Sequence, residues 1–249
     1  MLLSNSKKYL VKTGQYILHI LLPRTCFSCG RDLPYNAKGA LCPSCENGLT
    51  LPGPLICARC GVVLKSGGAH CFHCRGSKAD TFKCKIIRSA CEFNTFSRGL
   101  VHALKYQGAD YVAPYMGALM AQRFSAFAQL ADVNLVVPVP LYNARLKKRG
   151  YNQSELLARF FCKETGLALD VTSLVRLRDT CSQTKLGRQA RVENMAGAFG
   201  VKNPAVLKGK IILLIDDVAT TGATLEACAQ VLRRAGAKRV LAYTFARES

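Results

Sequence analysis

The chain has 249 residues, which is enough for one sizeable hydrophobic core and a smaller module. Its 35 lysines and arginines against 15 aspartates and glutamates give a formal charge of +20. This excess favours a polyanionic partner such as nucleic acid or a phosphorylated small molecule, although cellular composition or solubility would also account for it. No stretch approaches the ~20 consecutive apolar residues of a transmembrane helix, so we expect a cytoplasmic protein.

Residues 1–24 are expected to form a short amphipathic helix. An apolar stretch at 14–22 follows several lysines, as in a signal peptide, but it contains His19 and runs into Pro23 without a small-residue cleavage site. We therefore expect this helix to pack on the module that follows it.

Residues 25–78 contain four Cys-x-x-Cys pairs, in two copies of one pattern with a glycine after the first pair of each copy. The pairs are Cys26 with Cys29, Cys42 with Cys45, Cys57 with Cys60, and Cys71 with Cys74. In a cytosolic chain such pairs indicate metal rather than disulfides, and two pairs complete a tetrahedral zinc site. The region is too poor in aliphatic residues to form a core, so it needs the metal to fold.

The sequence therefore predicts a double zinc ribbon with structural zinc. We expect two ions, each bound by adjacent pairs, but a crossed arrangement or a single occupied site is also compatible with the spacing. His70 and His73 lie beside the last pair and could replace a thiolate, although histidines there more often lie outside the ligand shell.

A second domain is expected at 79–249, after a polar boundary at 76–80. Residues 86–93 have the pattern of a strand, residues 97–107 that of a helix, and residues 112–130 that of a longer amphipathic helix. Lys105, at the end of the first helix, either reaches a ligand or is simply solvated.

A buried strand is predicted at 135–140, where Pro138 and Pro140 end the ladder. Four cationic residues follow at 145–149, ending in Arg149, and then a glycine turn and Asn152, which with Glu155 has the spacing of a capping box. A proline-closed strand next to a basic cluster suits a second anion site formed by Pro138, Val139, Arg149 and Lys105. A solvated basic turn is the alternative.

Residues 176–199 are rich in polar groups and poor in core residues. They carry Arg176, Arg188 and Arg191, which suits a flexible basic loop that closes over a phosphate site. A charged surface helix is the alternative.

Residues 211–224 contain the most specific pattern of the chain. An apolar run without alternation predicts a strand buried on both faces, and Asp216 and Asp217 follow it at the edge where open α/β sheets bind ligands. A small hydroxyl-rich loop then opens a helix, where backbone N–H groups and the helix dipole suit a phosphate. Neither a Walker loop nor a dinucleotide turn is present. The pattern indicates a ligand that offers a phosphate together with hydroxyls or a metal.

This pattern resembles the diphosphoribose-binding motif of type I phosphoribosyltransferases. The resemblance implies that Asp216 and Asp217 hold the ribose 2- and 3-hydroxyls of phosphoribosyl pyrophosphate, which would bind with Mg²⁺. It also implies that the small loop surrounds the 5-phosphate, with Ala219, Thr220, Thr221, Gly222, Ala223 and Thr224 as the contacting residues.

The whole chain resembles the ComF family of competence and DNA utilisation proteins. The resemblance rests on the zinc ribbon, Val137-Pro138-Val139-Pro140, Arg149-Gly150-Tyr151-Asn152-Gln153, Thr180-x2-Gln183, Arg191-x2-Asn194 and the diphosphoribose motif. It implies an α/β, parallel-sheet type I phosphoribosyltransferase-like domain after a double zinc ribbon. In that fold the Val-Pro-Val-Pro turn takes the place of the pyrophosphate loop and residues 176–191 that of the flexible loop.

Three functions follow, in this order of preference. The first is handling of single-stranded DNA during uptake or utilisation, on the cytoplasmic side of the inner membrane, with phosphoribosyl pyrophosphate as regulator or substrate. The second is an active phosphoribosyltransferase that transfers phosphoribose to a nitrogen nucleophile, for which the sequence offers no evident general base. The third uses the zinc module to dock the chain on a competence helicase or an inner-membrane DNA channel.

Overall fold

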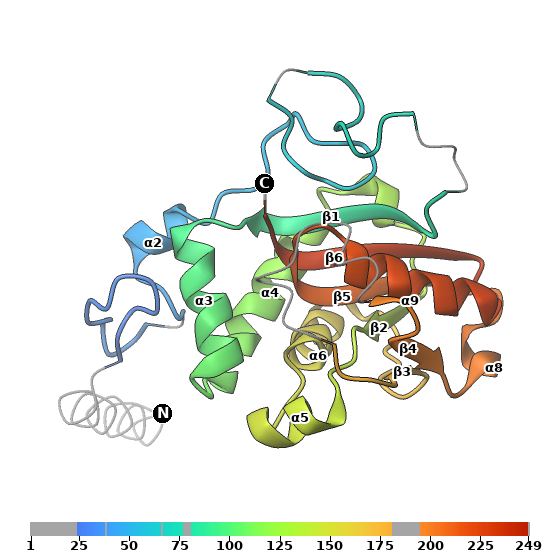
Figure 1. Cartoon of the computed structure of the whole chain (residues 1–249). Coiled ribbons are helices and arrows are strands. Elements are labelled where there is room, and N and C mark those ends of the chain that lie inside the picture. Colours follow the sequence, from blue (N-terminus) through green and yellow to red (C-terminus); the bar gives the residue numbers. More distant parts are fainter. Residues whose placement is uncertain (1–23, 38, 66, 77–80, 181–194, 249) are drawn as a thin grey trace, which may run out of the picture.

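The computed structural model describes residues 24–37, 39–65, 67–76, 81–180 and 195–248 (Figure 1). The helix expected at 1–24 and the domain boundary expected near 78 therefore lie outside the described residues, save Arg24. Among the residues that are described, no helix combines the length and the apolar character needed to cross a membrane.

A four-stranded parallel sheet forms the centre of the larger domain. Its strands are β1 (Cys84–Glu92), β2 (Leu135–Pro138), β5 (Ile211–Ala219) and β6 (Arg239–Arg247), and they lie in the order β1-β6-β5-β2. Every neighbouring pair is parallel, so all four carboxyl ends lie at one edge of the sheet. This confirms the predicted parallel α/β fold. Strand β6 was not among the predicted elements.

Alternate residues of β5 belong to two different cores. Ile212 and Leu214 pack on one face of the sheet, whereas Leu213 and Ile215 pack on the other, and all four are fully buried. A strand covered on both faces has no solvent-facing side chains, which explains the apolar run without alternation.

Helices cover both faces of the sheet. The core that contains Leu213 also contains residues of three helices, α3 (Thr95–Tyr106), α4 (Ala113–Phe124) and α6 (Gln153–Thr165). The core that contains Ile212 includes α9 (Ala223–Arg234). The helix predicted at 112–130 is shorter than expected: α4 ends at Phe124, and a 3₁₀ turn, η2 (Ala128–Leu130), follows. The turn places Phe127 against Tyr243 of β6, with ring centroids 5.8 Å apart.

The remaining described elements are short. They are α2 (Pro43–Asn47), η1 (Asp110–Val112), α5 (Asn143–Arg149), β3 (Leu174–Arg176), β4 (Phe199–Val201) and α8 (Pro204–Leu207). Strands β3 and β4 form an antiparallel pair, so both ends of the predicted flexible loop lie in a small sheet. Asn152 caps α6 by accepting from the Ser154 N–H, but Glu155 does not close a capping box and pairs instead with Arg159.

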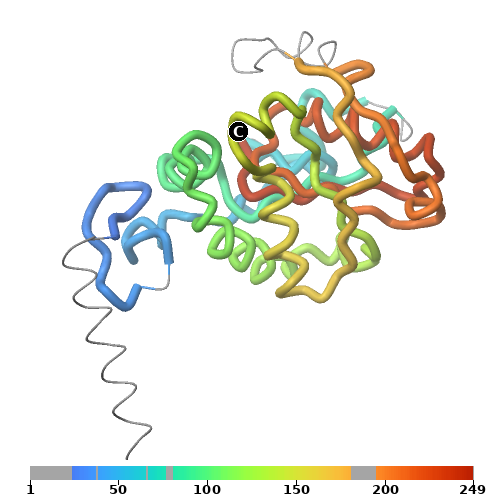
Figure 2. The backbone as a smooth tube through the Cα atoms, turned by 90° about the horizontal axis from the view of Figure 1, so that it is seen from below, coloured from blue at the N-terminus to red at the C-terminus, as the bar shows by residue number. Residues whose placement is uncertain are grey.

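The cysteine-rich region has two lobes, the first carrying Cys26 to Cys45 and the second Cys57 to Cys74, and they belong to different cores of the larger domain. The second lobe also bonds to the edge strand β1, where the Arg59 carbonyl accepts from the Ile87 N–H at 2.8 Å. Cys26, Cys42 and Cys45 of the first lobe belong to the core of α3, and Figure 2 shows this lobe at one end of the molecule beside that helix. Cys57 and Cys60 of the second lobe belong to the core of α9. Each lobe thus uses the larger domain to cover its apolar side, which a region with so few aliphatic residues cannot do alone.

Candidate functional site

Asp216 and Asp217 lie within β5, whereas the sequence pattern had placed them after the strand. The ladder between β5 and β6 continues past them to the pair Ala219 and Arg247, so the acidic pair is held by strand geometry. Both residues are buried, with 8% and 3% of their surface exposed, and both line a cavity of about 430 Å³ at the carboxyl edge of the sheet. The carboxylates are therefore fixed before any ligand arrives.

Asp216 has a raised pKa. It accepts hydrogen bonds from the Ser154 hydroxyl (2.7 Å) and from the Asp217 N–H (2.9 Å). Burial, followed by the charge of Asp217, raises the pKa of Asp216 to about 7. Its carboxyl group can therefore either donate or accept a hydrogen bond near neutral pH.

Asp217 is paired with Lys105, whose Nζ lies 2.7 Å from Oδ2 of the carboxylate. Burial by itself would lower the pKa of Lys105, but the neighbouring charges of Asp217 and Asp216 outweigh it, so that pKa is raised. Lys105 was assigned from the sequence to the predicted anion site at the end of β2, together with Arg149. The structure places it on the acidic pair, because α3 ends beside the carboxyl end of β5.

The loop between β5 and α9 opens the helix toward the same cavity. Gly222 precedes the first helical residue with φ of +79°, a left-handed conformation that glycine adopts without strain. The first-turn N–H groups of a helix lack partners within the helix and carry the positive end of its dipole. Ala223 and Thr224 line the cavity, and the positive end of the dipole of α9 therefore faces it, although the Ala223 N–H itself donates to the Thr221 hydroxyl at 3.3 Å.

The structure brings most of the predicted ligand residues to one cavity. Its lining includes Lys105, Val139, Arg149, Arg176, Asp216, Asp217, Ala219, Thr220, Gly222, Ala223 and Thr224. Two predicted residues lie elsewhere: Thr221 lines a neighbouring cavity, and Pro138 is buried in β2, where it pairs with Ile215. Arg188 and Arg191 fall outside the described residues.

Several lining residues were missed in the sequence. Arg98 and His102 line the cavity from α3, at helical spacings of seven and three residues before Lys105. That common spacing was the signal that could have identified them. Arg145, from α5, also lines the cavity and contacts the segment after β3, through the Thr180 carbonyl (2.5 Å) and the Asp179 carboxylate (2.9 Å).

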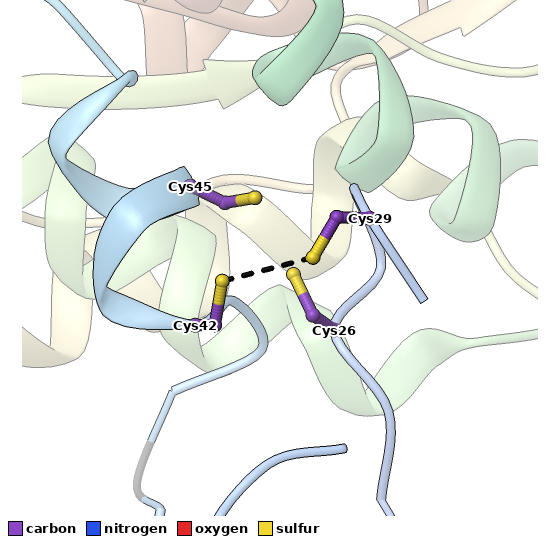
Figure 3. A group of neighbouring side chains, drawn as sticks. All are labelled: Cys26, Cys29, Cys42 and Cys45. Atoms are coloured by element: carbon purple, nitrogen blue, oxygen red, sulfur yellow. Dashed lines mark hydrogen bonds between the residues drawn. The ribbon is translucent and has the colours of Figure 1, made fainter. Parts of the chain in front are cut away.

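The eight paired cysteines gather into two groups of four, each formed by adjacent pairs. Figure 3 shows the first group, Cys26, Cys29, Cys42 and Cys45, with its sulfurs pointing to a common centre. The second group consists of Cys57, Cys60, Cys71 and Cys74. Within each group all sulfurs lie within 4.8 Å of one another.

These distances fit zinc. The sulfurs of Cys29 and Cys42 are 3.7 Å apart, and so are those of Cys60 and Cys71. A tetrahedral ion with Zn–S bonds of about 2.3 Å has sulfur–sulfur edges of about 3.8 Å. The grouping does not follow the crossed arrangement, and His70 and His73 belong to neither group among the described residues. The cysteines therefore form two sites for structural zinc, and each site consists of four cysteine thiolates.

The second lobe is joined to the end of β5 and the loop that follows it through Arg247, and to α9 through Arg59. Arg247 of β6 donates to the carbonyls of Cys60 (3.0 Å), Ala219 (2.8 Å) and Thr220. Arg59, between two cysteines of this lobe, pairs with Glu226 in the first turn of α9 at 3.2 Å. The position of the loop therefore depends on the second lobe.

Comparison with known proteins matches both parts of the chain. Residues 17–75 match the model of the double zinc ribbon domain, and residues 145–249 match that of the phosphoribosyl transferase domain. Among solved structures, a glutamine phosphoribosylpyrophosphate amidotransferase from B. subtilis overlaps 52% of this chain and 25% of its own, with a TM-score of 0.35 and 21% identity. That overlap is too slight to assign an activity.

Curated relatives match over nearly the full chain. The DNA utilization protein YhgH of Salmonella typhimurium is 30% identical over 92% of this chain and 99% of its own. Competence protein F of Haemophilus influenzae is 29% identical over 89% of this chain and 96% of its own. Competence protein ComFC of Bacillus subtilis is 31% identical over 92% of this chain and 88% of its own.

The grouping of the cysteines predicts the zinc content of variants. The purified protein should contain two zinc ions per chain, and Cys45→Ser and Cys74→Ser should each remove one, since each disrupts one group of four. Metal analysis by mass spectrometry measures the content. Cys162→Ser, which lies in α6 outside both groups, is the control and should keep both ions. Loss of both ions from either single variant would contradict two independent sites.

The pKa of Asp216 predicts a pH dependence of stability. The folded protein keeps the Asp216 proton up to about pH 7, whereas the unfolded chain releases it near 3.8. Between these values the folded state binds more protons, so this residue makes stability fall as pH rises, by up to about 4 kcal/mol. Asp216→Asn removes this effect. The thermal midpoint of the variant minus that of the wild type should therefore increase from pH 4 to pH 7.

Differential scanning calorimetry at a series of pH values measures this difference. Asp132→Asn is the matched control, because the Asp132 side chain is 72% exposed. The plot of its thermal midpoint against pH should run parallel to that of the wild type. Parallel curves for Asp216→Asn as well would show that Asp216 is ionised in the folded protein throughout the range.

Proposed function

This chain belongs to the ComF family of competence and DNA utilization proteins, and we propose that it handles single-stranded DNA during DNA uptake or utilisation and binds phosphoribosyl pyrophosphate. The relatives' names and the charge of +20 support the DNA role. The observation that carries the second part is the cavity in which a buried acidic pair, a phosphate-type loop and several cations meet.

The acidic pair suits the ribose of this ligand. A ribose offers two neighbouring hydroxyls, each of which can donate and accept a hydrogen bond. Asp217, whose carboxylate is paired with Lys105, suits a hydroxyl that donates, and Asp216, with a pKa of about 7, suits either direction. The cavity of about 430 Å³ has the size of a small-molecule site.

The two ends of the ligand would meet opposite walls of the cavity. The 5-phosphate would lie against Thr220, Gly222 and the start of α9, where the helix dipole has its positive end. The diphosphate would face Arg149 and Arg176, which line the cavity from α5 and β3. The carboxylates and the diphosphate are oxygen donors of the kind that Mg²⁺ prefers, and the ion would neutralise charge on the diphosphate.

An active phosphoribosyltransferase is the alternative function. A nitrogen nucleophile would form a bond to ribose C1, and the bond from C1 to the diphosphate oxygen would break and release pyrophosphate. The pKa of about 7 for Asp216 favours this alternative, since a group that titrates near neutrality suits proton transfer. Positioning and charge stabilisation by the cavity cations would supply most of the effect.

We propose three segments for these roles: an N-terminal amphipathic helix at 1–24, the zinc ribbon at 25–78 and the phosphoribosyltransferase-like domain at 79–249. The protein would work in the cytoplasm, peripheral to the inner membrane. The zinc ribbon would then dock it on a competence helicase or a DNA channel, since ribbons bind protein and nucleic acid alike.

Titration calorimetry with phosphoribosyl pyrophosphate and Mg²⁺ tests the ligand site. Asp216→Ala/Asp217→Ala should weaken binding by ~100-fold or more, because charged hydrogen bonds contribute ~1.5–3 kcal/mol each. Asp132→Ala, which lies outside the cavity, should bind as the wild type does. Unchanged affinity in the folded, zinc-loaded double variant would reject the site. Release of pyrophosphate with a nucleobase present would separate an enzyme from a binding protein.

The DNA role predicts a steep dependence of binding on salt. The logarithm of the association constant for a fluorescent single-stranded oligonucleotide should fall with log[salt], with a slope of about −0.7 for each phosphate neutralised. Fluorescence anisotropy measures it. A flat dependence, or no binding at low salt, would reject DNA handling. Repeating the titration with phosphoribosyl pyrophosphate present would measure coupling between the two ligands.

A further inference from the structure

A second cavity lies between the second cysteine lobe and the loop that opens α9. Its volume is about 630 Å³, and Thr220 and Thr221 of that loop form one wall. Phe72, Lys65 and Arg75 of the lobe line the other side. The proposed phosphoribosyl pyrophosphate site does not use these three lobe residues. Thr221, which was expected to contact the 5-phosphate, faces this second cavity instead.

Phe72 presents an aromatic ring to solvent on a braced turn. The residue is 87% exposed, and its ring contacts that of His73 edge-on, with centroids 5.5 Å apart. The Cys71 carbonyl accepts from the N–H groups of Cys74 and Arg75, both at 2.9 Å. Because Cys71 and Cys74 belong to one group of four cysteines, a zinc ion bound there would hold the turn that carries the ring. The ring is therefore available for stacking at a small entropic cost.

The charges around this ring favour an anionic ligand. Lys65 and Arg75 are exposed, and neither forms an ion pair with an acidic side chain in the described part of the chain. Arg247 adds a buried guanidinium to the wall, and Glu248 is the acidic member of the lining. The Cys60 and Cys71 thiolates also line the cavity, and a zinc ion with four thiolates has a formal charge of −2. Since Arg247 is already bonded to three carbonyls, the cations that remain for an anionic ligand beside the ring are Lys65 and Arg75.

We propose that this second cavity is a nucleotide subsite for single-stranded nucleic acid, with one base stacked on Phe72 and the adjoining phosphates on Lys65 and Arg75. An exposed aromatic ring flanked by cations is the combination that binds single strands, whose bases are free to stack. A duplex would not offer its base faces. The proposal rests on the DNA role of the proposed function and assigns it a surface.

The subsite also adjoins the ligand cavity. Thr220 and Glu248 line both cavities, so a strand on Phe72 would touch the loop proposed to hold the 5-phosphate. Single-stranded DNA and phosphoribosyl pyrophosphate would then share one loop, which gives a direct physical route for coupling between them.

The chain contains no tryptophan, so Phe72→Trp introduces a single fluorescent probe at the subsite. Adding unlabelled oligo(dT) should quench this fluorescence with the same midpoint as the binding measured by anisotropy. Tyr111→Trp is the matched control: Tyr111 is 64% exposed and lies against Phe27 of the first lobe, away from the second cavity. Its fluorescence should not change.

Affinity gives an independent readout. Phe72→Ala should weaken binding of oligo(dT) by about 5- to 150-fold, the range for loss of one stacked base. Tyr111→Ala should have no effect. Lys65→Ala/Arg75→Ala should make the salt slope shallower by about 1.4, which corresponds to two phosphate contacts on a single strand. All variants should retain two zinc ions and bind phosphoribosyl pyrophosphate as the wild type does.

Two failures are distinguishable. If the wild type binds oligo(dT) but Phe72→Trp is not quenched and Phe72→Ala binds normally, the subsite is wrong and the DNA role stands on another surface. If the wild type binds no oligo(dT) at low salt, the DNA role and the subsite both fall. If Phe72→Ala loses zinc, its affinity cannot be interpreted, and the other two variants test the subsite. Quenching of Phe72→Trp and a shallower salt slope for Lys65→Ala/Arg75→Ala would support the subsite, and the absence of both would reject it.

Discussion

The buried guanidinium of Arg247 is the interaction on which the arrangement of the ligand loop depends. It lies at the end of β6 and donates to the backbone of the second cysteine lobe at Cys60 and to the loop at Ala219 and Thr220. A buried charge is tolerated only when its donors are satisfied, and here three backbone carbonyls accept from it. One side chain thus joins the zinc module, the last strand and the phosphate-type loop.

A second constraint comes from burying two adjacent carboxylates. Asp216 and Asp217 cannot both carry an uncompensated charge at so low an exposure. The structure gives Asp217 the cation of Lys105, while burial and the charge of Asp217 raise the pKa of Asp216, which accepts a hydrogen bond from Ser154. The result is a preorganised pair that suits neighbouring hydroxyls, which is the chemistry expected of a ribose site at the carboxyl edge of a parallel sheet.

The zinc ribbon is more than an appended module in this family member. Its first lobe belongs to the core of α3 and its second lobe to that of α9, which the second lobe also meets through Arg59 and Glu226. The same lobe carries Phe72 beside the ligand loop. A module that binds nucleic acid at this position would lie in contact with the small-molecule site, so the two proposed ligands of the chain would be neighbours.

Local patterns in the sequence determined the elements and their chemistry. The apolar run of β5 and the spacing of the cysteine pairs each encode structure within a few residues, so the parallel sheet and the two cysteine groups could be predicted, whereas the role of the loop after the acid pair stays a prediction. Only the tertiary structure decided which distant groups meet. It placed Lys105 on Asp217, Arg247 on the loop and Thr221 in the second cavity. The physical reason is that such contacts depend on how helix faces and lobes pack across the sheet, and no spacing along the chain records that packing.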